Sequence, residues 1–537
     1  MFHFFTARTA KGKPIMPATN KKLRPLEVLI AAVVTTGSAE AASVSVGAYA
    51  VANHSSCGAG NIPGTIEEMN RFFASPDLPA DMQKNFYWKD ARVRQNEWIK
   101  DGDNKASSEA SNGFDGADAS LLTYIASHGV TSSGVYKALA GSKNAGGCYI
   151  PTTSLELGNN TSRYTILSTC QGLKIGTGDY PESSGENPTR TWKNAAKGLN
   201  CIFGYSNNMA DADQYGEYLL ANLKDGSTSL SKAFMDASES VSADNIPAVL
   251  CYGSSEQDAA DYIEENKTFE SQSRPNAASA WVYRKVYAAS KGPSLKSSIP
   301  AALKLVPVKL NIEKFAKSLV GGGATKSVSG RITTFSSNTG VATYNEKTGT
   351  LTVKNFLAAD ARGDAVPSLE ESQQIAEHAL KLTGLSKVDR SLQLASFAEE
   401  RIGGVQGAGK ITSRKFTFKQ NLAGGQSLSQ QGSVDVTVGS GGAITEIKTA
   451  LVKIDPAFTP SSRPTNLASR EVELETSALD QVAMRAPGAS YKVIKKRIGY
   501  DAGNFMKRNQ IAPAVIEFTV EAYKGDFKRN FVQKIAL

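Results

Sequence analysis

Between residues 44 and 253, short apolar runs alternate with segments of helical periodicity. The apolar runs have the length and flanking turn residues of buried strands; they span residues 44–51, 121–126, 164–169, 199–205 and 246–251. Helices are expected at residues 65–73, with Thr65 as the cap, and at residues 213–224 and 229–238. Strands separated by helices indicate an α/β fold, with a largely parallel sheet covered by helices on both faces.

Downstream of residue 325 the pattern changes to one helix followed by alternating strands, and this order occurs twice. The first helix is expected at residues 368–382, where Ser368 precedes Glu371 by the three positions of a capping box. The second is expected at residues 473–484. We therefore divide the chain into residues 43–292, a small-residue, Lys- and Pro-rich linker at 293–324, and two α+β modules at 325–460 and 461–537.

Length and charge exclude several classes of protein. A chain of 537 residues is too long for one ordinary core. The net charge of +9 is modest, and no Lys/Arg stripe with interleaved aromatic residues is present, so no nucleic-acid partner is expected. No stretch after the N-terminal region has the apolar length of a membrane span.

The N-terminal segment has the features of an export signal. Lys21, Lys22 and Arg24 precede an apolar run at residues 29–34, and Ala39-Glu40-Ala41 resembles a signal-peptidase site. We expect residues 1–42 to be a leader and the mature chain to be secreted, periplasmic or at the cell surface.

Five cysteines all lie in the first half of the chain, and their odd number leaves at least one unpaired. No Cys-x-x-Cys motif occurs, and there are only four histidines, so neither a metal site nor a cofactor is expected. Disulfides remain possible. Cys57 to Cys148 is the first pair to test, because Cys201 and Cys251 lie in runs typical of central strands.

His128 and Cys170 each follow an apolar run, and a glycine comes one or two residues later. In an open α/β sheet the carboxyl ends of neighbouring parallel strands share one crevice, so the two side chains are expected to meet there. An imidazole beside a thiol is the usual means of generating a nucleophilic thiolate. The alternative is that Cys170 is a core residue and His128 a hydrogen-bonded loop residue.

The order of these motifs resembles the caspase/gingipain-like superfamily of cysteine peptidases over roughly residues 43–290. The resemblance is carried by a His-Gly strand, a Ser-Thr-Cys-Gln-Gly strand ending at residue 172, a Trp192 helix and the strand at residues 198–204. Within the superfamily the chain is similar to the DUF6345 type of bacterial secreted proteins. It departs from that type in having Ser127 before His128, and Ser168-Thr169 before Cys170. The resemblance implies a caspase-like fold and a His/Cys dyad.

The second half resembles the cystatin-like PepSY and fungalysin/thermolysin-propeptide modules. The resemblance is carried by the runs at residues 416–420, 432–438, 442–447 and 513–520. It implies modules that inhibit a catalytic domain or assist its folding. No His-Glu-x-x-His motif is present, so the chain is not a zinc metallopeptidase of that kind.

For the dyad we expect attack by Cys170 on a peptide carbonyl and protonation of the leaving amine by His128, with an imidazolium/thiolate pair at rest. Backbone N–H groups of Gly129 and Cys170 are candidates for holding the oxyanion, although Gly129 also suits a plain tight turn. Asp118 is a candidate for orienting the imidazole.

Asp211 and Asp213 are candidates for a pocket that accepts a basic substrate side chain, or alternatively for capping the helix that begins near residue 213. The predicted function is a secreted cysteine endopeptidase acting on peptides or proteins, with regulatory or substrate-positioning C-terminal modules. The alternative is a catalytically degenerate relative that acts as an exported binding protein through exposed strand edges.

Overall fold

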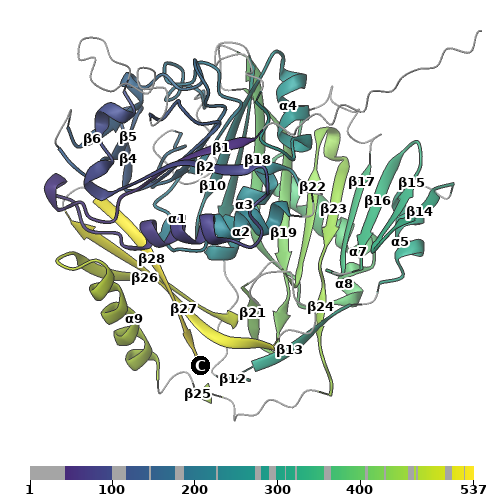
Figure 1. The fold of residues 1–537 in the computed structure, drawn as a ribbon. Coiled ribbons are helices and arrows are strands. Elements are labelled where there is room, and N and C mark those ends of the chain that lie inside the picture. Colours follow the sequence, from purple (N-terminus) through teal and green to yellow (C-terminus); the bar gives the residue numbers. More distant parts are fainter. Residues whose placement is uncertain are drawn as a thin grey trace, which may run out of the picture. The chain divides into compact units, whose positions relative to one another are not determined.

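Five parallel strands form one end of the longest sheet in the protein (Figure 1). Their order is β8-β7-β3-β1-β2, and β8, β7 and β3 consist of residues that are buried throughout. The strands are β1 (Val44–Ala50), β2 (Met82–Lys89), β3 (Leu122–Ala126), β7 (Tyr164–Ser168) and β8 (Cys201–Tyr205). Apolar residues on both faces suit a parallel sheet that is covered on both sides.

The computed structural model describes most of the chain after the leader. The described residues are 43–99, 116–143, 147–175, 187–224, 226, 228–242, 244–271, 280–288, 298–300, 302–308, 310–320, 323–346, 348–355, 365–404, 409–428, 431–457, 465–466, 470–501, 511–524 and 527–537. The predicted leader at residues 1–42 lies outside them.

The α-helices of the first half all pack on the same face of the sheet. They are α1 (Gly64–Ala74), α2 (Tyr215–Leu223), α3 (Leu230–Val241) and α4 (Glu256–Glu265), and their buried side chains join one core cluster with that face. Ser229 and Ser255 cap α3 and α4. Thr65 does not cap α1, which begins after Pro63, and its hydroxyl instead donates to the Ile62 carbonyl.

The opposite face of the sheet is covered by loops, 3-10 turns and a small antiparallel sheet. That sheet contains β4 (Gly129–Ser132), β5 (Val135–Leu139) and β6 (Tyr149–Pro151), and the turns are η1 (Ser55–Cys57), η2 (Asp90–Arg92), η3 (Gln95–Glu97) and η4 (Thr152–Ser154). Trp98, Tyr136 and Trp192 fill this second core, to which no described α-helix contributes. The expected Trp192 helix is a series of turns. The prediction of a sheet sandwiched by helices is therefore wrong.

The sheet also continues through antiparallel strands into the second half of the chain. After β10 (Pro247–Gly253) and β11 (Ala280–Ala288) it adds β18 (Gln393–Gly404), β19 (Lys410–Lys419), β22 (Ser433–Val438), β23 (Ile444–Thr449), β17 (Thr350–Asn355), β16 (Gly340–Asn345), β15 (Ile332–Ser336) and β14 (Thr325–Ser329). The result is a mixed sheet of 15 strands in a mostly β protein, which overturns the predicted caspase-like α/β class. The sheet continues because the edge of β11 that faces away from β10 offers unpaired backbone groups, and β18 pairs with them.

Helices of the second half cover this antiparallel extension. They are α5 (Ile312–Val320), α7 (Leu369–Leu382) and α8 (Leu385–Val388), and α7 packs on β19 and β22. The predicted capping box of Ser368 and Glu371 is confirmed, with both reciprocal hydrogen bonds present.

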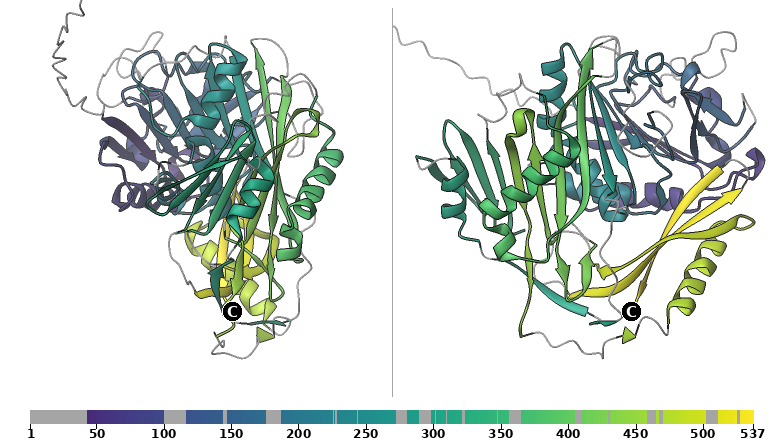
Figure 2. Two further views of the ribbon diagram at one scale, coloured as in Figure 1. Left: turned by 90° about the vertical axis from the view of Figure 1, so that its right-hand side faces the viewer. Right: turned by 180° about the vertical axis from the view of Figure 1, so that it is seen from behind.

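A second sheet is formed mainly by β26 (Ser490–Tyr500), β27 (Ile511–Lys524) and β28 (Phe527–Ala536), with α9 (Glu471–Arg485) packed on all three (Figure 2). Short strands extend it or lie beside it: β9 (Ala210–Asp211), β13 (Ala302–Pro307), β20 (Asn421–Leu422), β21 (Gly425–Ser427) and β24 (Val452–Ile454). Three further elements are β12 (Ser298–Ile299), its partner strand β25 (Thr465–Asn466), and η5 (Ser440–Gly442).

The segment expected as a linker, residues 293–324, contains β12, β13 and α5 among its described residues. The chain from Ala42 to Leu537 is one compact unit, and the predicted domain boundaries stay predictions. Within the described residues, no helix has the length and apolar character needed to cross a bilayer.

Candidate cysteine–histidine site

The register between β3 and β7 brings His128 and Cys170 to the same sheet edge. Ala126 pairs with Ser168 in this parallel ladder, so His128 and Cys170 each lie two residues beyond a paired position. Neighbouring strands are about 4.8 Å apart. The sequence prediction that the two strands deliver these side chains to one place is supported by this register.

Gly129 is needed because the two strand ends approach so closely. A Cβ atom at this position would lie 2.4 Å from the carbonyl oxygen of Cys170, which no side chain tolerates. The residue opens β4 and has no left-handed backbone conformation, so a tight turn does not explain it. Its role as an oxyanion donor stays a prediction.

Cys170 is the one free cysteine, and it is buried. The other four form disulfides, Cys57 to Cys148 and Cys201 to Cys251. The first pair is the one that the sequence analysis put forward. The second joins paired residues of the neighbouring strands β8 and β10, an adjacency that strand patterns alone do not reveal.

The Cys170 thiol donates a hydrogen bond to the Lys528 carbonyl at 3.5 Å. Nη1 of Arg529 lies 3.8 Å from the sulfur. Burial raises the pKa of Cys170 above its ordinary value, and the neighbouring Arg529 guanidinium opposes that rise. In this closed arrangement the sulfur is therefore held as a neutral thiol.

His128 is also buried, and its Nε2 lies 2.7 Å from the Gly60 carbonyl oxygen. The carbonyl fixes the proton on Nε2, which leaves Nδ1 as the basic nitrogen. Its ring packs against His54 with 4.7 Å between centroids. Burial, followed by the charge of Arg529, lowers the pKa of His128 to about 4. The closed site thus favours a neutral imidazole, and not the imidazolium/thiolate pair expected at rest.

Gln171, directly after the thiol, adopts a left-handed backbone conformation with a φ of 60°. Its carbonyl accepts from the Thr131 hydroxyl at 2.7 Å, and its side-chain oxygen accepts from the Thr131 N–H at 3.0 Å. The side-chain amide donates to Asn208 at 3.0 Å. A non-glycine residue in this conformation is strained and persists only where its surroundings hold it, as at many functional sites.

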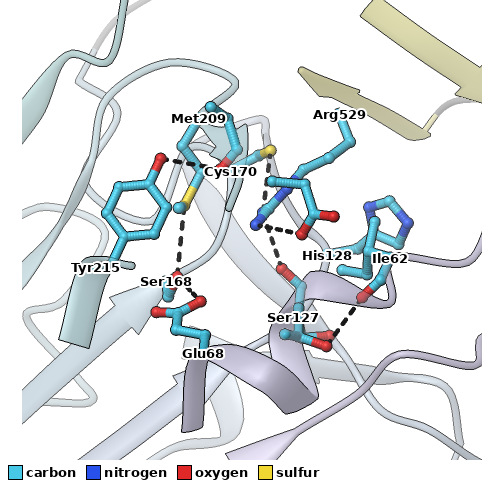
Figure 3. A network of polar contacts seen from close by, with 12 residues as sticks. Ile62, Glu68, Ser127, His128, Ser168, Cys170, Met209, Tyr215 and Arg529 are labelled. Carbon is cyan, nitrogen blue, oxygen red and sulfur yellow. Dashed lines mark hydrogen bonds and ion pairs between the residues drawn. The ribbon is translucent and has the colours of Figure 1, made fainter. Parts of the chain in front are cut away.

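Strand β28 enters this site from the C-terminal end of the chain. It pairs in parallel with β9, with Asn530 opposite Ala210 and Phe531 opposite Asp211. Arg529 points into the site, where Nη1 donates to the Ser127 carbonyl at 3.3 Å (Figure 3). Its side chain is 1% exposed. We call His128, Cys170, Asp211 and Arg529 together the Cys170 site.

Asp211 is fully buried and lies between two guanidinium groups. Its Oδ1 is 3.6 Å from Nη2 of Arg529, and its Oδ2 is 2.9 Å from Nη2 of Arg485 on α9. It therefore belongs to the site and caps no helix. The helix α2 begins only at Tyr215, after an N-cap Gln214 without a side-chain bond.

Two other predicted residues lie elsewhere. Asp213 pairs with Arg71 of α1 at 3.1 Å and is partly exposed. Asp118 accepts hydrogen bonds from the backbone N–H groups of Gly158, Asn160 and Ser162, so it orders the loop before β7. Burial raises the pKa of Asp118 to about 6, while those hydrogen bonds oppose the rise. The roles predicted for Asp118 and Asp213 stay predictions.

The comparisons with known proteins identify one family over part of the chain. Residues 49–285 match the model of a domain of unknown function, DUF6345. We call this the DUF6345 segment. The match confirms that part of the resemblance; the broader likeness to caspases and the likeness to PepSY modules stay untested.

Solved structures add little to this. One that matches is the crystal structure of an uncharacterized protein from Eubacterium rectale, 11% identical, with a TM-score of 0.29, covering 44% of this chain and 82% of that chain. A likeness of that size carries no argument about the fold. No curated protein matches the chain.

Glu68 is a residue of the DUF6345 segment that sequence reasoning missed. It is buried under the Cys170 site, where it accepts hydrogen bonds from Tyr124 at 2.5 Å and Ser168 at 2.9 Å. Burial raises the pKa of Glu68 to about 8. A signal was present, because Glu68 falls with Thr65 and Phe72 on the helical stripe that faces the core.

All groups with candidate chemistry lie in the DUF6345 segment, whereas both arginines on Asp211 come from outside it. The described residues contain no group of His, Cys, Asp and Glu side chains that could hold a metal ion. The site offers a nucleophile, a base and a carboxylate, beneath a strand from the far end of the chain.

Proposed function

We propose that the DUF6345 segment is a cysteine peptidase with Cys170 as nucleophile and His128 as general base and acid. The observation that carries this proposal is the β3–β7 register, which delivers the one free thiol and a histidine to the same strand edge. The strained Gln171 beside the thiol supports it, because such strain is typical of functional sites.

In this mechanism His128 takes the thiol proton as the sulfur attacks a peptide carbonyl carbon and forms an S–C bond. The C–N bond then breaks, and His128 returns the proton to the leaving amine. Water, deprotonated by His128, attacks the resulting thioester, and the thiol regains its proton as the S–C bond breaks. Backbone N–H groups of Gly129 and Cys170 are the proposed oxyanion donors.

The described conformation is a latent form of this peptidase. The thiol donates to Lys528 and His128 to Gly60, so neither contact prepares a thiolate. Activity requires β28 to leave the thiol. We propose a relation to the caspase/gingipain-like superfamily on the basis of motif order and site chemistry. The proposal does not include the helix-sandwiched α/β fold, which the 15-stranded mixed sheet contradicts.

For the C-terminal modules we propose a PepSY-like, regulatory role. Each packs a long helix on antiparallel strands, α7 in the first and α9 in the second. We also propose an extracytoplasmic location, which the two disulfides favour because such bonds persist in oxidising compartments.

The second candidate function is an exported binding protein with an inactive site. The observation that favours it is the burial of Cys170 and His128 in neutral forms. Hydrolysis distinguishes the two candidates.

The test is hydrolysis of a broad peptide library by the full chain and by Arg529→Ala, each alone and combined with Cys170→Ser or His128→Gln. We expect turnover that Cys170→Ser abolishes and that His128→Gln lowers by roughly 10²–10⁴-fold, the range for general acid–base catalysis. His378→Gln, on the exposed face of α7, is the matched control. Absence of turnover in both backgrounds, or turnover that survives Cys170→Ser, would reject the peptidase and favour the binding protein.

A further inference from the structure

Strand β28 lies in the Cys170 site as a bound peptide ligand would. Its backbone pairs with β9, and the Asn530 N–H donates to the Met209 carbonyl at 3.3 Å. The side chain of Asn530 adds a hydrogen bond to the Asn208 carbonyl at 2.7 Å. In peptide recognition by strand addition, main-chain hydrogen bonds supply affinity and pockets for alternate side chains supply specificity.

The residues of this segment have different surroundings. Arg529 is buried in the Cys170 site, whereas Phe531 belongs to the core of the second sheet, where the guanidinium of Arg485 lies 5.2 Å from the centre of its ring. Lys528, which precedes Arg529 on β28, has a side chain that is 52% exposed. The segment therefore presents the side chains of Arg529 and Asn530 to the DUF6345 segment.

Arg529 is poorly suited to a purely structural role. Among the described residues, its Nε and Nη2 have no hydrogen-bond partner, and neither has Oδ1 of Asp211. The ion pair between Nη2 and Oδ1 is loose, at 3.6 Å. Burying a guanidinium costs several kcal/mol that only well-formed contacts offset. A guanidinium that satisfies these groups better would therefore displace Arg529 from Asp211.

We propose that the groove along β9, with Asp211 at its base, binds extended peptide segments that carry an arginine, and that β28 is its built-in occupant. The occupant covers Cys170, and its Lys528 carbonyl engages the thiol. An external segment with an arginine competes with β28 for the same carboxylate. The groove proposal names arginine-containing peptides as the substrate class of the proposed peptidase. Only the hydrolysis of these peptides rests on the proposed function.

The rival interpretation is that Arg529 and Arg485 only fasten the second sheet to the DUF6345 segment. It predicts that loss of Arg529 uncovers the thiol but that no separate peptide occupies the groove through an arginine. The matched control is Lys534→Ala, since Lys534 lies on β28 but pairs with Asp501 at 3.0 Å, within residues 461–537.

The first measurement is the rate at which iodoacetamide modifies Cys170 in the folded, non-reduced full chain. We expect Arg529→Ala to raise this rate by at least about tenfold, because alkylation of a covered thiol follows the open population. Lys534→Ala is expected to change it less than about twofold on the same reasoning. Equal rates in wild type and Arg529→Ala, or equal rises in both variants, overturn the proposal.

The second measurement is binding of a fluorescent peptide with the sequence of Phe527–Ala536 to the full chain carrying Arg529→Ala and Cys170→Ser. We expect binding that weakens at least about tenfold, or about 1.4 kcal/mol, when the peptide arginine is alanine or when the protein also carries Asp211→Asn. Binding that neither change weakens overturns the proposal. The proposal also fails if the double variant binds no peptide although Arg529→Ala alone has an accessible Cys170 thiol.

The two proposals fail separately. Arginine-dependent binding without any hydrolysis retains the groove and rejects the peptidase. Cys170-dependent hydrolysis with arginine-independent binding retains the peptidase and rejects the arginine-binding groove.

Discussion

The two C-terminal sheet regions meet the DUF6345 segment in different ways. The first joins through the β11–β18 ladder, in which nine successive residue pairs continue one sheet across the junction. Arg284 reinforces it by pairing with Glu400 and Glu264. Among the described residues, the second joins through two β9–β28 pairs, through buried charges and through Ile62, which lies in the core of the second sheet.

Asp244 shows the character of the second junction. It accepts hydrogen bonds from Lys495 and from Thr519, and lies 3.2 Å from Arg497. Burial raises the pKa of Asp244, but Arg497 and Lys495 outweigh it and hold the value below the ordinary range. The strands of a continuous ladder separate only when the core packed on them unfolds, whereas charged side-chain contacts can be exchanged for contacts with water or another ligand. The β11–β18 junction therefore suits a structural role, and the β9–β28 junction suits a regulatory one.

The largest expected effect comes from breaking the ladder. Ala398 pairs with Val286 on one side and Lys415 on the other. Ala398→Pro should cost about 3 kcal/mol or more, because proline removes a ladder hydrogen bond in a central strand. Denaturant unfolding should show destabilisation of the entire unit. The control Ala398→Gly should cost about 1 kcal/mol, and equal stability of the two variants would contradict the scaffold role.

A smaller, local effect is expected from Asp211→Asn. The change leaves Arg485 and Arg529 without their carboxylate, a loss of about 3 kcal/mol for a broken buried pair. Hydrogen exchange should become faster in β28 and α9 while β18 keeps its protection. Asp213→Asn, which removes a partly exposed pair with Arg71, should cost less than about 1 kcal/mol. Simultaneous loss of protection in β18 and β28 would show that the two junctions are not independent.

The smallest effect concerns pH. Glu68 has a pKa of about 8 in the folded protein and an ordinary value of 4.5. The folded state therefore holds an additional proton between these values, so its contribution to stability is complete below pH 4.5 and lost as pH rises through 8. Between pH 6 and pH 7 this amounts to about 1.4 kcal/mol at most.

The variant Glu68→Gln keeps a neutral hydrogen-bonding group and should flatten this pH dependence. Chemical unfolding at a series of pH values measures it. The matched control is Glu67→Gln, since Glu67 is a neighbour on α1 whose side chain is half exposed. An unchanged slope for Glu68→Gln would show that the buried carboxyl is ionised throughout.

Sequence patterns predicted those parts of the fold that are encoded locally. The apolar run that forms β7 specifies a buried strand on its own, and Ser368 with Glu371 specifies a helix start. Cys170 and His128 were found because both follow such strands. Asp118 was a candidate because a strand-entry carboxylate that orders a loop has the same sequence context as one that orients a histidine.

Features that depend on distant segments escaped prediction. The resemblance to caspase-like peptidases implied a helix at Trp192, yet Trp192 fills the second core from a series of turns. The pairing of β11 with β18 depends on two edges that the chain brings together across more than a hundred residues. Arg529 carries no motif, and only the folded chain shows that it meets Asp211.

The contact between Arg529 and Cys170 joins positions 359 residues apart in the sequence. Closing so large a loop costs more entropy than forming the β3–β7 or β7–β8 ladders, whose partners are close in the chain. We expect the strand edge that carries His128 and Cys170 to form first and β28 to arrive last. Each molecule would then pass through an interval in which its thiol is assembled and uncovered, so the order of folding itself sets when the protein is open to other peptides.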